Sequence, residues 1–246
     1  MVLELSIFGI VTGFISGFFG VGGGMVLVPM LLQIGFVMKE AVAISIMQMV
    51  FGSIYGTYLN LKNTKDLFKD GIFIGIGGFL GGLQSSIIHK YFSNEALEFF
   101  FLCIILFSIY RIGVSSPIGN REKKTHNKPL LVFIGFIIGM IAMSIGVGGS
   151  VMLTPILVGY LFYNLKDASS LGLFFVIFSS IAGFLSLSYA GEMLYVEGFI
   201  VGIASLVGVY FGIKAKQIVH IKNYKIYLLI LNTLILLGML YQIFIV

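Results

Sequence analysis

The chain carries very little charge for its length. Of its 246 residues, 10% are Asp, Glu, Lys or Arg and 59% are hydrophobic, and the mean hydropathy is +1.08. A soluble domain has about 25% charged residues, so this chain has too few polar groups to cover a surface in water. Apolar runs fill nearly its whole length, which predicts a protein that crosses a lipid bilayer several times. The net charge of +5 does not indicate nucleic-acid binding, because the basic residues fall in short loops.

Groups that carry out chemistry are also scarce. The single cysteine, Cys103, lies within an apolar run, where we expect it to pack as a small apolar residue and to form no disulfide within the chain. No charged residue falls deep within a predicted span, which argues against a cationic substrate and reveals no proton relay. The histidines His89, His126 and His220 are expected in loops, without metal-ligand spacing. We therefore predict no catalytic residue, no metal, no cofactor and no enzymatic activity.

The sequence repeats itself. Residues 9–32 match residues 135–158 at an offset of 126, with ten identities in 24 positions. After a one-residue insertion the match continues, because Lys39-Glu40-Ala41 is followed 127 residues later by Lys166-Asp167-Ala168. A match in this order indicates an internal duplication. The predicted domains are a membrane repeat at 1–112, a basic linker at 113–128 and a second membrane repeat at 129–246.

The apolar runs define the predicted membrane topology. If each run crossed the bilayer once, the 15 Lys and Arg residues would divide 8 to 7 between the two sides. If the run at 129–162 instead enters and leaves on the same side, they divide 13 to 2, which places the linker in the cytoplasm and the C-terminus outside. The eight runs are 2–37, 41–60, 71–89, 96–112, 129–162, 168–189, 197–213 and 226–245.

This topology predicts the fold class. The chain is expected to be an all-α polytopic membrane protein of two inverted repeats, each a broken glycine hairpin followed by three transmembrane helices. The hairpin in the first repeat rests on symmetry with the second, since no Lys or Arg precedes it to fix its orientation. Each hairpin is either re-entrant or a pair of short spans.

Each hairpin contains a glycine-rich break, "FFGVGGGMVLVP" at 18–29 and "SIGVGGSVMLTP" at 144–155. Irregular backbone at membrane depth is tolerated only where protein buries it or it lines a wet cavity. A helix that begins there presents free N–H groups and the positive end of its dipole, which together bind anions. Two inverted copies would direct two helix starts at one substrate. The alternative is that these glycines only allow close helix packing, although the run Gly22-Gly23-Gly24 is denser than packing requires.

The point at which each second helix begins is open from the sequence alone. Gly24 and Ser150 are candidate starts, and so are Pro29 and Pro155, unless the prolines lie inside kinked helices.

The candidate substrate-binding residues combine the breaks with nearby polar side chains. Gln48 either lines the site or forms a hydrogen bond between helices, and the Ser and Thr hydroxyls either face the site or bond to backbone carbonyls. The full candidate set is Gly20, Gly22, Gly23, Gly24, Pro29, Ser45, Gln48, Ser144, Gly146, Gly148, Gly149, Ser150, Thr154, Pro155 and Ser179.

The duplicated motif resembles that of a known family. G-x-x-x-G followed by "GVGGG…P", and repeated as "GVGGS…P", is similar to the TauE/SafE family of sulfite exporters. The resemblance covers the whole chain and implies a multi-pass protein of a prokaryotic inner membrane. It implies transport of sulfite, sulfonates such as sulfoacetate, thiosulfate or other small organic anions. Ser150 replaces the last glycine in the second copy, so the two halves need not contribute equally.

The sequence therefore favours a secondary transporter that moves a small anion by alternating access. An anion channel of the same architecture is the first alternative. A membrane-embedded enzyme is the second, but it would need reactive groups that the spans do not contain. The expected partners are the small anion and the lipid bilayer, with no nucleic acid. The oligomeric state is open, a homodimer included.

Overall fold

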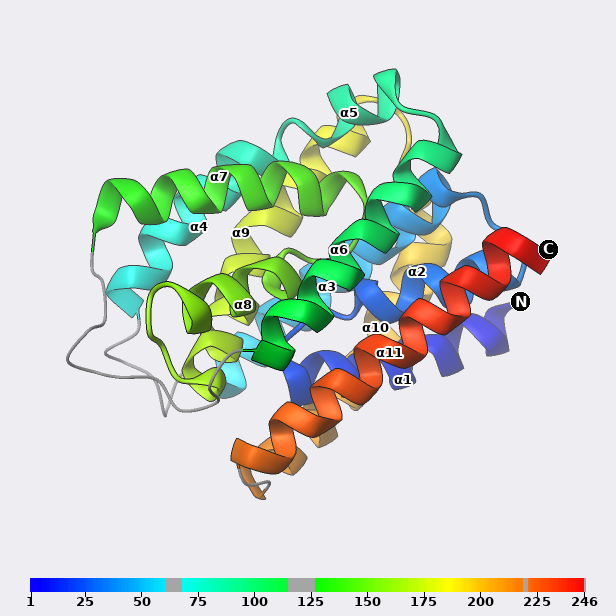
Figure 1. Cartoon of the computed structure of the whole chain (residues 1–246). Coiled ribbons are helices and arrows are strands. Elements are labelled where there is room, and N and C mark those ends of the chain that lie inside the picture. Colours follow the sequence, from blue (N-terminus) through cyan, green and yellow to red (C-terminus); the bar gives the residue numbers. More distant parts are fainter. Residues whose placement is uncertain (61–67, 115–126, 219–220, 246) are drawn as a thin grey trace.

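The computed structural model of the chain describes residues 1–60, 68–114, 127–218 and 221–245, and every regular element in these ranges is a helix. The helices fall into two sets, one from each predicted half (Figure 1). The first set is α1 (Val2–Phe19), α2 (Gly24–Gln33), α3 (Met38–Asn60), α4 (Phe68–Gly82), α5 (Ser85–Tyr91) and α6 (Asn94–Val114). The second set is α7 (Lys128–Ser144), α8 (Ser150–Gly159), α9 (Leu165–Tyr189), α10 (Tyr195–Ile218) and α11 (Ile221–Ile245).

Seven helical segments of the described chain are long and apolar enough to cross a membrane, which confirms the polytopic all-α class. The helices α2 and α8 have ten residues each. At 1.5 Å per residue they are about 15 Å long, half the thickness of a bilayer core of about 30 Å, so neither can cross alone. The seven segments are Val2–Phe19, Met38–Leu59, Asp70–Tyr91, Asn94–Val114, Asp167–Tyr189, Tyr195–Ile218 and Lys225–Gln242.

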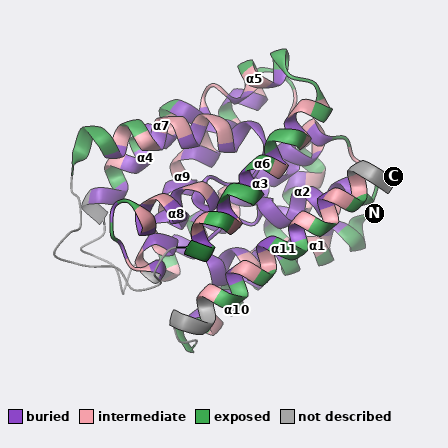
Figure 2. Ribbon diagram, viewed as in Figure 1, coloured by how far each residue is buried: buried purple, intermediate pink, exposed green. Residues whose placement is uncertain are grey.

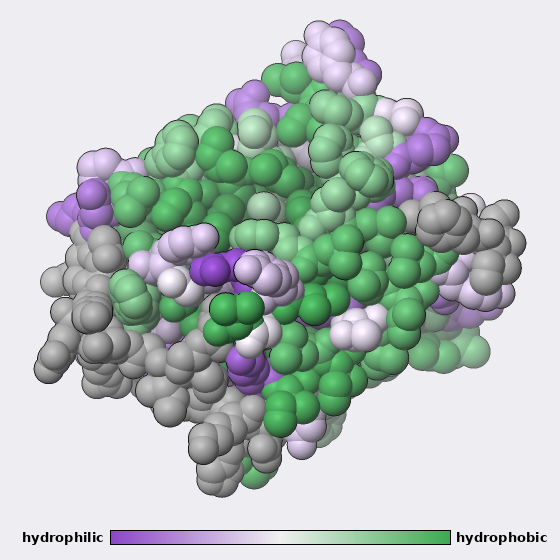
Figure 3. Space-filling view, viewed as in Figure 1, coloured by the Kyte–Doolittle hydropathy of each residue, from purple (hydrophilic) through white to green (hydrophobic). Residues whose placement is uncertain are grey.

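The outer surface suits lipid. Large apolar side chains are exposed along the helices, among them Phe99, Phe211 and Leu234, each more than half exposed. Apolar residues cover most of the face seen in Figure 3, whereas the buried residues in Figure 2 lie in the interior, where they make up most of α2 and α8. Water-soluble monomers rarely expose an apolar surface of this extent.

Long helices of one half pack mainly against long helices of the other half. α1 packs mainly against α10, and α7 packs mainly against α4. In the same way α3 packs against α10 and α9 against α4. The helices α1 and α7, α3 and α9, and α4 and α10 therefore take equivalent places in this packing. These are the pairs that the offset of the sequence repeat predicts. α1 and α7 run in opposite directions in Figure 1.

Glycines allow the closest of these helix contacts. A Cβ atom on Gly13 of α1 would overlap the backbone of Ser205 on α10, and one on Gly77 of α4 would overlap the carbonyl oxygen of Val132 on α7. The backbones therefore approach until almost no side-chain volume separates them, as in other membrane helix pairs with small residues at the interface.

The third apolar run, 71–89, lies within the candidate span Asp70–Tyr91, and a turn at Leu83 and Gln84 divides this span into α4 and α5. His89 was expected in a loop, but it lies on α5 and its side chain is fully buried.

Candidate functional site

The first glycine break connects α1 to α2 through three left-handed residues. Gly20, Gly22 and Gly23 have φ angles of +69°, +83° and +80°. A side chain at such φ values is strained, whereas glycine adopts them freely. The Gly20 N–H donates to the carbonyl oxygen of Ser16 at 2.7 Å and closes α1. The chain then turns sharply and α2 begins at Gly24.

The second break repeats this conformation at the equivalent positions. Gly146, Gly148 and Gly149 have φ angles of +69°, +83° and +58°, and α8 begins at Ser150. The helix starts predicted at Gly24 and Ser150 are confirmed. The alternative starts at the prolines are wrong, because Pro29 and Pro155 are buried inside α2 and α8.

The two breaks touch each other at the centre of the molecule. A Cβ atom on Gly22 would lie 3.3 Å from the Cα of Gly148. A Cβ atom on Gly24 would overlap the carbonyl oxygen of Gly146. Ser45 of α3 donates its hydroxyl to that same carbonyl oxygen at 3.2 Å, and also to Val42 of its own helix at 2.8 Å. The backbone itself therefore forms the contact between the halves.

Polar groups without partners gather at the first break. The backbone N–H groups from Gly22 to Met25 form no hydrogen bond with any residue that the structure describes. Gln48 of α3 is fully buried, yet neither its Oε1 nor its Nε2 has a hydrogen-bond partner. Its Oε1 lies 2.5 Å from the position of a Cβ atom on Gly23. Buried amides almost always find partners, so this cluster fits a site that accepts a polar ligand.

The second break differs from the first in its lining. Phe175 of α9 lies 127 residues after Gln48, the offset of this part of the repeat, and its ring occupies the space that a Cβ atom on Gly149 would need. One break is therefore lined by an amide and the other by an aromatic ring. The Oγ of Ser150 and the Oγ1 of Thr154 on α8 are buried without hydrogen-bond partners.

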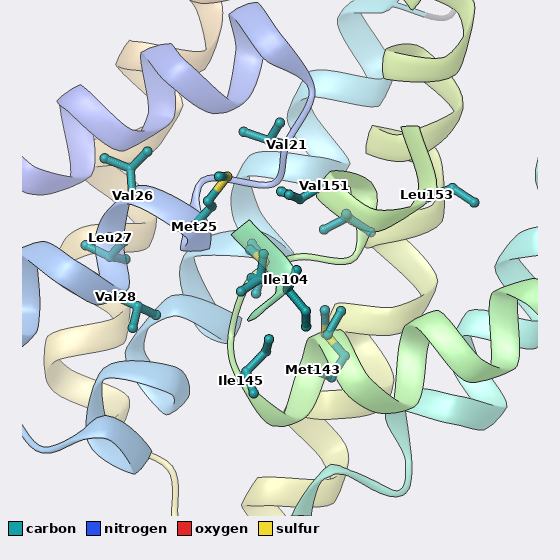
Figure 4. Close-up of a cluster of buried hydrophobic side chains, with 14 of the residues drawn as sticks. Val21, Met25, Val26, Leu27, Val28, Ile104, Met143, Ile145, Val151 and Leu153 are labelled. Atoms are coloured by element: carbon teal, nitrogen blue, oxygen red, sulfur yellow. The ribbon is translucent and has the colours of Figure 1, made fainter. Parts of the chain in front are cut away.

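Apolar side chains surround both breaks (Figure 4). Val21, Met25, Ile145 and Val151 are all at most 3% exposed and lie around the point where the breaks meet. They exclude water from the two helix starts, and polar interactions are stronger in such a low-dielectric environment. The named residues at the breaks carry no charge.

Three predicted site residues have their contacts within the protein. The hydroxyls of Ser144 and Ser179 donate to carbonyl oxygens of their own helices, at Met140 and Phe175, with distances of 2.7 Å and 3.2 Å. This is the alternative that the sequence left open for such residues. Gly20 packs against Ser169 of α9, whose hydroxyl donates to the carbonyl oxygen of Phe19 at 2.6 Å.

Three residues near the breaks were not among the candidates predicted from the sequence. The sulfur of Met49 lies 3.3 Å from the position of a Cβ atom on Gly22 and 2.7 Å from that on Gly148. Lys216 near the end of α10 is 5% exposed and donates to the hydroxyl of Ser169 at 3.0 Å. The offset of the repeat, applied to Gln48, is the signal that could have identified Phe175.

Comparison with known proteins identifies similar chains. Residues 5–239 match the family model for sulfite exporter TauE/SafE. A probable membrane transporter protein of Bacillus subtilis, YunE, is 21% identical over 244 residues, which cover 89% of this chain and 88% of that protein. A probable membrane transporter protein of Haemophilus influenzae is 26% identical over 216 residues, covering 84% of this chain and 81% of that protein. No solved structure gives a significant match.

Proposed function

Because this chain belongs to the sulfite exporter TauE/SafE family, we propose that it is a secondary transporter that moves a small anion across the membrane. The anion binds between the two glycine breaks, and the two halves then rock against each other to expose it on alternate sides. The substrate class is a sulfur-containing oxyanion or organosulfonate, of which sulfite, sulfoacetate and thiosulfate are examples.

The observation that carries this proposal is the cluster of unpaired donors at the first break. Backbone N–H groups at a helix start, aided by the helix dipole, suit the oxygens of an anion. Gln48 adds two N–H donors within the same buried region. One oxyanion between the breaks would satisfy these donors at once. Since the lining residues are neutral, selectivity for an anion comes from the backbone and from the side-chain amide.

The packing of helices between the two halves supports alternating access. Each half contributes one break to the central contact, so a relative rotation of the halves changes the space between α2 and α8. We propose that the repeats are inverted in the membrane, with residues 113–128 in the cytoplasm and the C-terminus outside. The two relatives named above come from Bacillus subtilis and Haemophilus influenzae, and a prokaryotic cell membrane is the proposed location.

The test is flux of labelled sulfite into proteoliposomes, with sulfoacetate and thiosulfate as competitors. The wild type should show saturable flux, whereas the double variant Gly23→Leu plus Gly149→Leu should show none while still eluting as a folded protein. Gly113→Leu is the matched control, because a side chain at Gly113 meets open space. Equal flux in wild type and double variant would mean that the glycines only pack. Flux that does not saturate would indicate a channel.

A further inference from the structure

His89 makes a buried polar contact that the anion site does not use. Its imidazole is fully buried, with Nδ1 2.8 Å from Oε2 of Glu192 and Nε2 2.8 Å from the carbonyl oxygen of Ser144. The three partners come from distant parts of the chain: α5, the end of α7 and the segment between α9 and α10. Glu192 is 33% exposed, so the carboxylate connects the buried ring to water.

The geometry requires a proton beyond those of a neutral imidazole and a carboxylate. A carbonyl oxygen can only accept, and so can an ionised carboxylate. A neutral imidazole has one N–H and could satisfy only one of these two acceptors. Both contacts are hydrogen bonds only if the ring is an imidazolium, or if Glu192 is protonated and donates to Nδ1. In either arrangement the pair holds one extra proton.

The carbonyl oxygen that the ring contacts lies at the start of the second glycine break. Ser144 is the last residue of α7, and the break begins directly after it at Ile145. When the pair loses its proton, one of the two contacts must be lost, and a buried polar group then lacks a partner. Moving α5 away from α7 would give that group to water. The protonated pair therefore favours the conformation in which this end of the molecule is closed.

The duplicated half carries a different residue at the same position. His89 corresponds to Lys216 at the offset of 127 that relates Asp70-Gly71 to Glu197-Gly198. Lys216 donates to Ser169, which in turn donates to the carbonyl oxygen of Phe19, the last residue of α1. A basic group thus acts near the end of each helix that leads into a break. Lysine ordinarily keeps its proton near neutral pH, whereas imidazole exchanges one between pH 5 and 8.

We propose that His89 and Glu192 form a proton-binding site that controls the opening of the transporter at the end where α5 lies, the end that the topology predicts to be external. Binding of the proton keeps this end closed, and opening it releases one proton to water through Glu192. The control of transport rests on the proposed function, whereas the proton-binding site itself does not.

The surroundings leave few other groups that could titrate in its place. α5 packs against α7 and α9. In the described chain, the titratable groups near this contact are Lys90 and Tyr91 on α5 and Tyr189 at the end of α9, all exposed at the surface. The titratable groups at the near ends of the neighbouring helices are Tyr195 and Glu197 at the start of α10, and Glu95 and Glu98 near the start of α6.

The first experiment detects the proton without measuring transport. The sequence has three histidines, so His126→Gln plus His220→Gln leaves His89 as the only imidazole. Nitrogen-15 NMR of histidine-labelled protein in nanodiscs distinguishes imidazolium from neutral imidazole, and infrared spectroscopy detects a protonated carboxyl group. We expect one of these two signatures at pH 6 and its loss as the pH rises. A neutral ring beside an ionised Glu192 throughout pH 5 to 9 would overturn the proposal.

The second experiment measures how the flux through the protein depends on pH. Glu192→Gln should remove the need for the proton, because the new amide donates to Nδ1 while the neutral ring donates from Nε2 to Ser144. At each pH the wild-type flux is divided by the flux of Glu192→Gln. This ratio should rise with pH, by up to about tenfold per pH unit for a one-proton step. This ratio cancels any titration of the substrate. Lys90→Gln, a neighbouring exposed change, should keep the wild-type profile.

A second variant keeps the test possible if Glu192→Gln does not fold. His89→Gln removes the titratable ring and should give the same flat profile as Glu192→Gln. A wild-type pH profile that persists in both variants would overturn the control of transport. If the protein moved no sulfur anion at all, the proposed function would fail, whereas the NMR result would still decide whether the pair binds a proton.

Discussion

Gln48 provides the sharpest test of the anion site, because its two roles predict opposite effects on stability. If Gln48 binds the substrate, its amide is unsatisfied in the ligand-free protein, as the structure shows. If instead it bonds to another helix, its removal should destabilise the fold. Gln48→Leu separates the two, since leucine has a similar volume and no polar group.

The expected change in the free energy of unfolding follows from the two unpaired atoms of the Gln48 amide. An unsatisfied buried donor or acceptor costs about 1–3 kcal/mol. Replacing the fully buried amide should therefore stabilise the ligand-free protein by about 2 kcal/mol. For a chain of this size each kcal/mol shifts the midpoint of thermal unfolding by about 2–4 °C, so Tm should rise by about 4–8 °C. Loss of a hydrogen bond to an anion, about 1.5–3 kcal/mol, should raise KM by about 10- to 100-fold.

The assay combines thermal unfolding in detergent with flux in proteoliposomes. Gln33→Leu is the control, because Gln33 is an exposed glutamine at the end of α2, and its change should shift stability by less than about 0.5 kcal/mol. A lower Tm for Gln48→Leu would refute the reasoning. It would show that the amide holds helices together and that the polar cluster at the first break is structural.

Two further substitutions test two separate features, namely the contact between the two glycine breaks and the buried hydroxyl of Tyr163. Gly24→Ala should lower the free energy of unfolding by about 1–2 kcal/mol, because the overlap of the new Cβ atom with Gly146 costs more than the gain of about 1 kcal/mol in helix propensity. The control Gly113→Ala places its Cβ atom in open space and should raise the free energy of unfolding by at most about 1 kcal/mol. Equal stabilisation by both variants in denaturant unfolding would show that the breaks do not touch. Burial, and then the hydrogen bond to Asp70, raise the pKa of Tyr163 above its ordinary value of 10.0. The folded protein then keeps this proton while the unfolded chain loses it, so the stability from this group is complete below pH 10 and declines above it. Unfolding midpoints measured from pH 9 upward should fall more steeply for wild type than for Tyr163→Phe, and parallel curves would contradict this.

Much of the fold could be predicted from the sequence because its signals are local. Hydropathy along 18 or more residues identifies a span without reference to any other segment. The glycine motifs marked where the two breaks lie, but the sequence left the starts of the second helices open, and the structure placed them at Gly24 and Ser150. The sequence did not indicate the turn at Gln84, which divides the third run between two helices, because an unbroken apolar run does not reveal where packing favours a turn.

The candidate site could be predicted only in part. The glycines and Gln48 were candidates from the sequence, and the structure places Gln48 against Gly23. The hydroxyls of Ser144 and Ser179 were candidates as well, but they bond within their own helices. Whether a hydroxyl faces a site or its own backbone depends on the rotation of its helix, which the sequence does not state.

The sequence by itself determined that this chain is a membrane protein with two glycine breaks, and it indicated a duplication, because composition, hydropathy and repeat spacing are properties of the chain order. Only the tertiary structure decided which groups meet. It brought Gly22 to Gly148, and it placed Gln48 against Gly23 and Phe175 against Gly149. It also buried His89, expected in a loop, between Glu192 and Ser144, 103 and 55 residues away. Contacts across such separations depend on how the helices of the two halves pack, and that packing is a property of the whole fold.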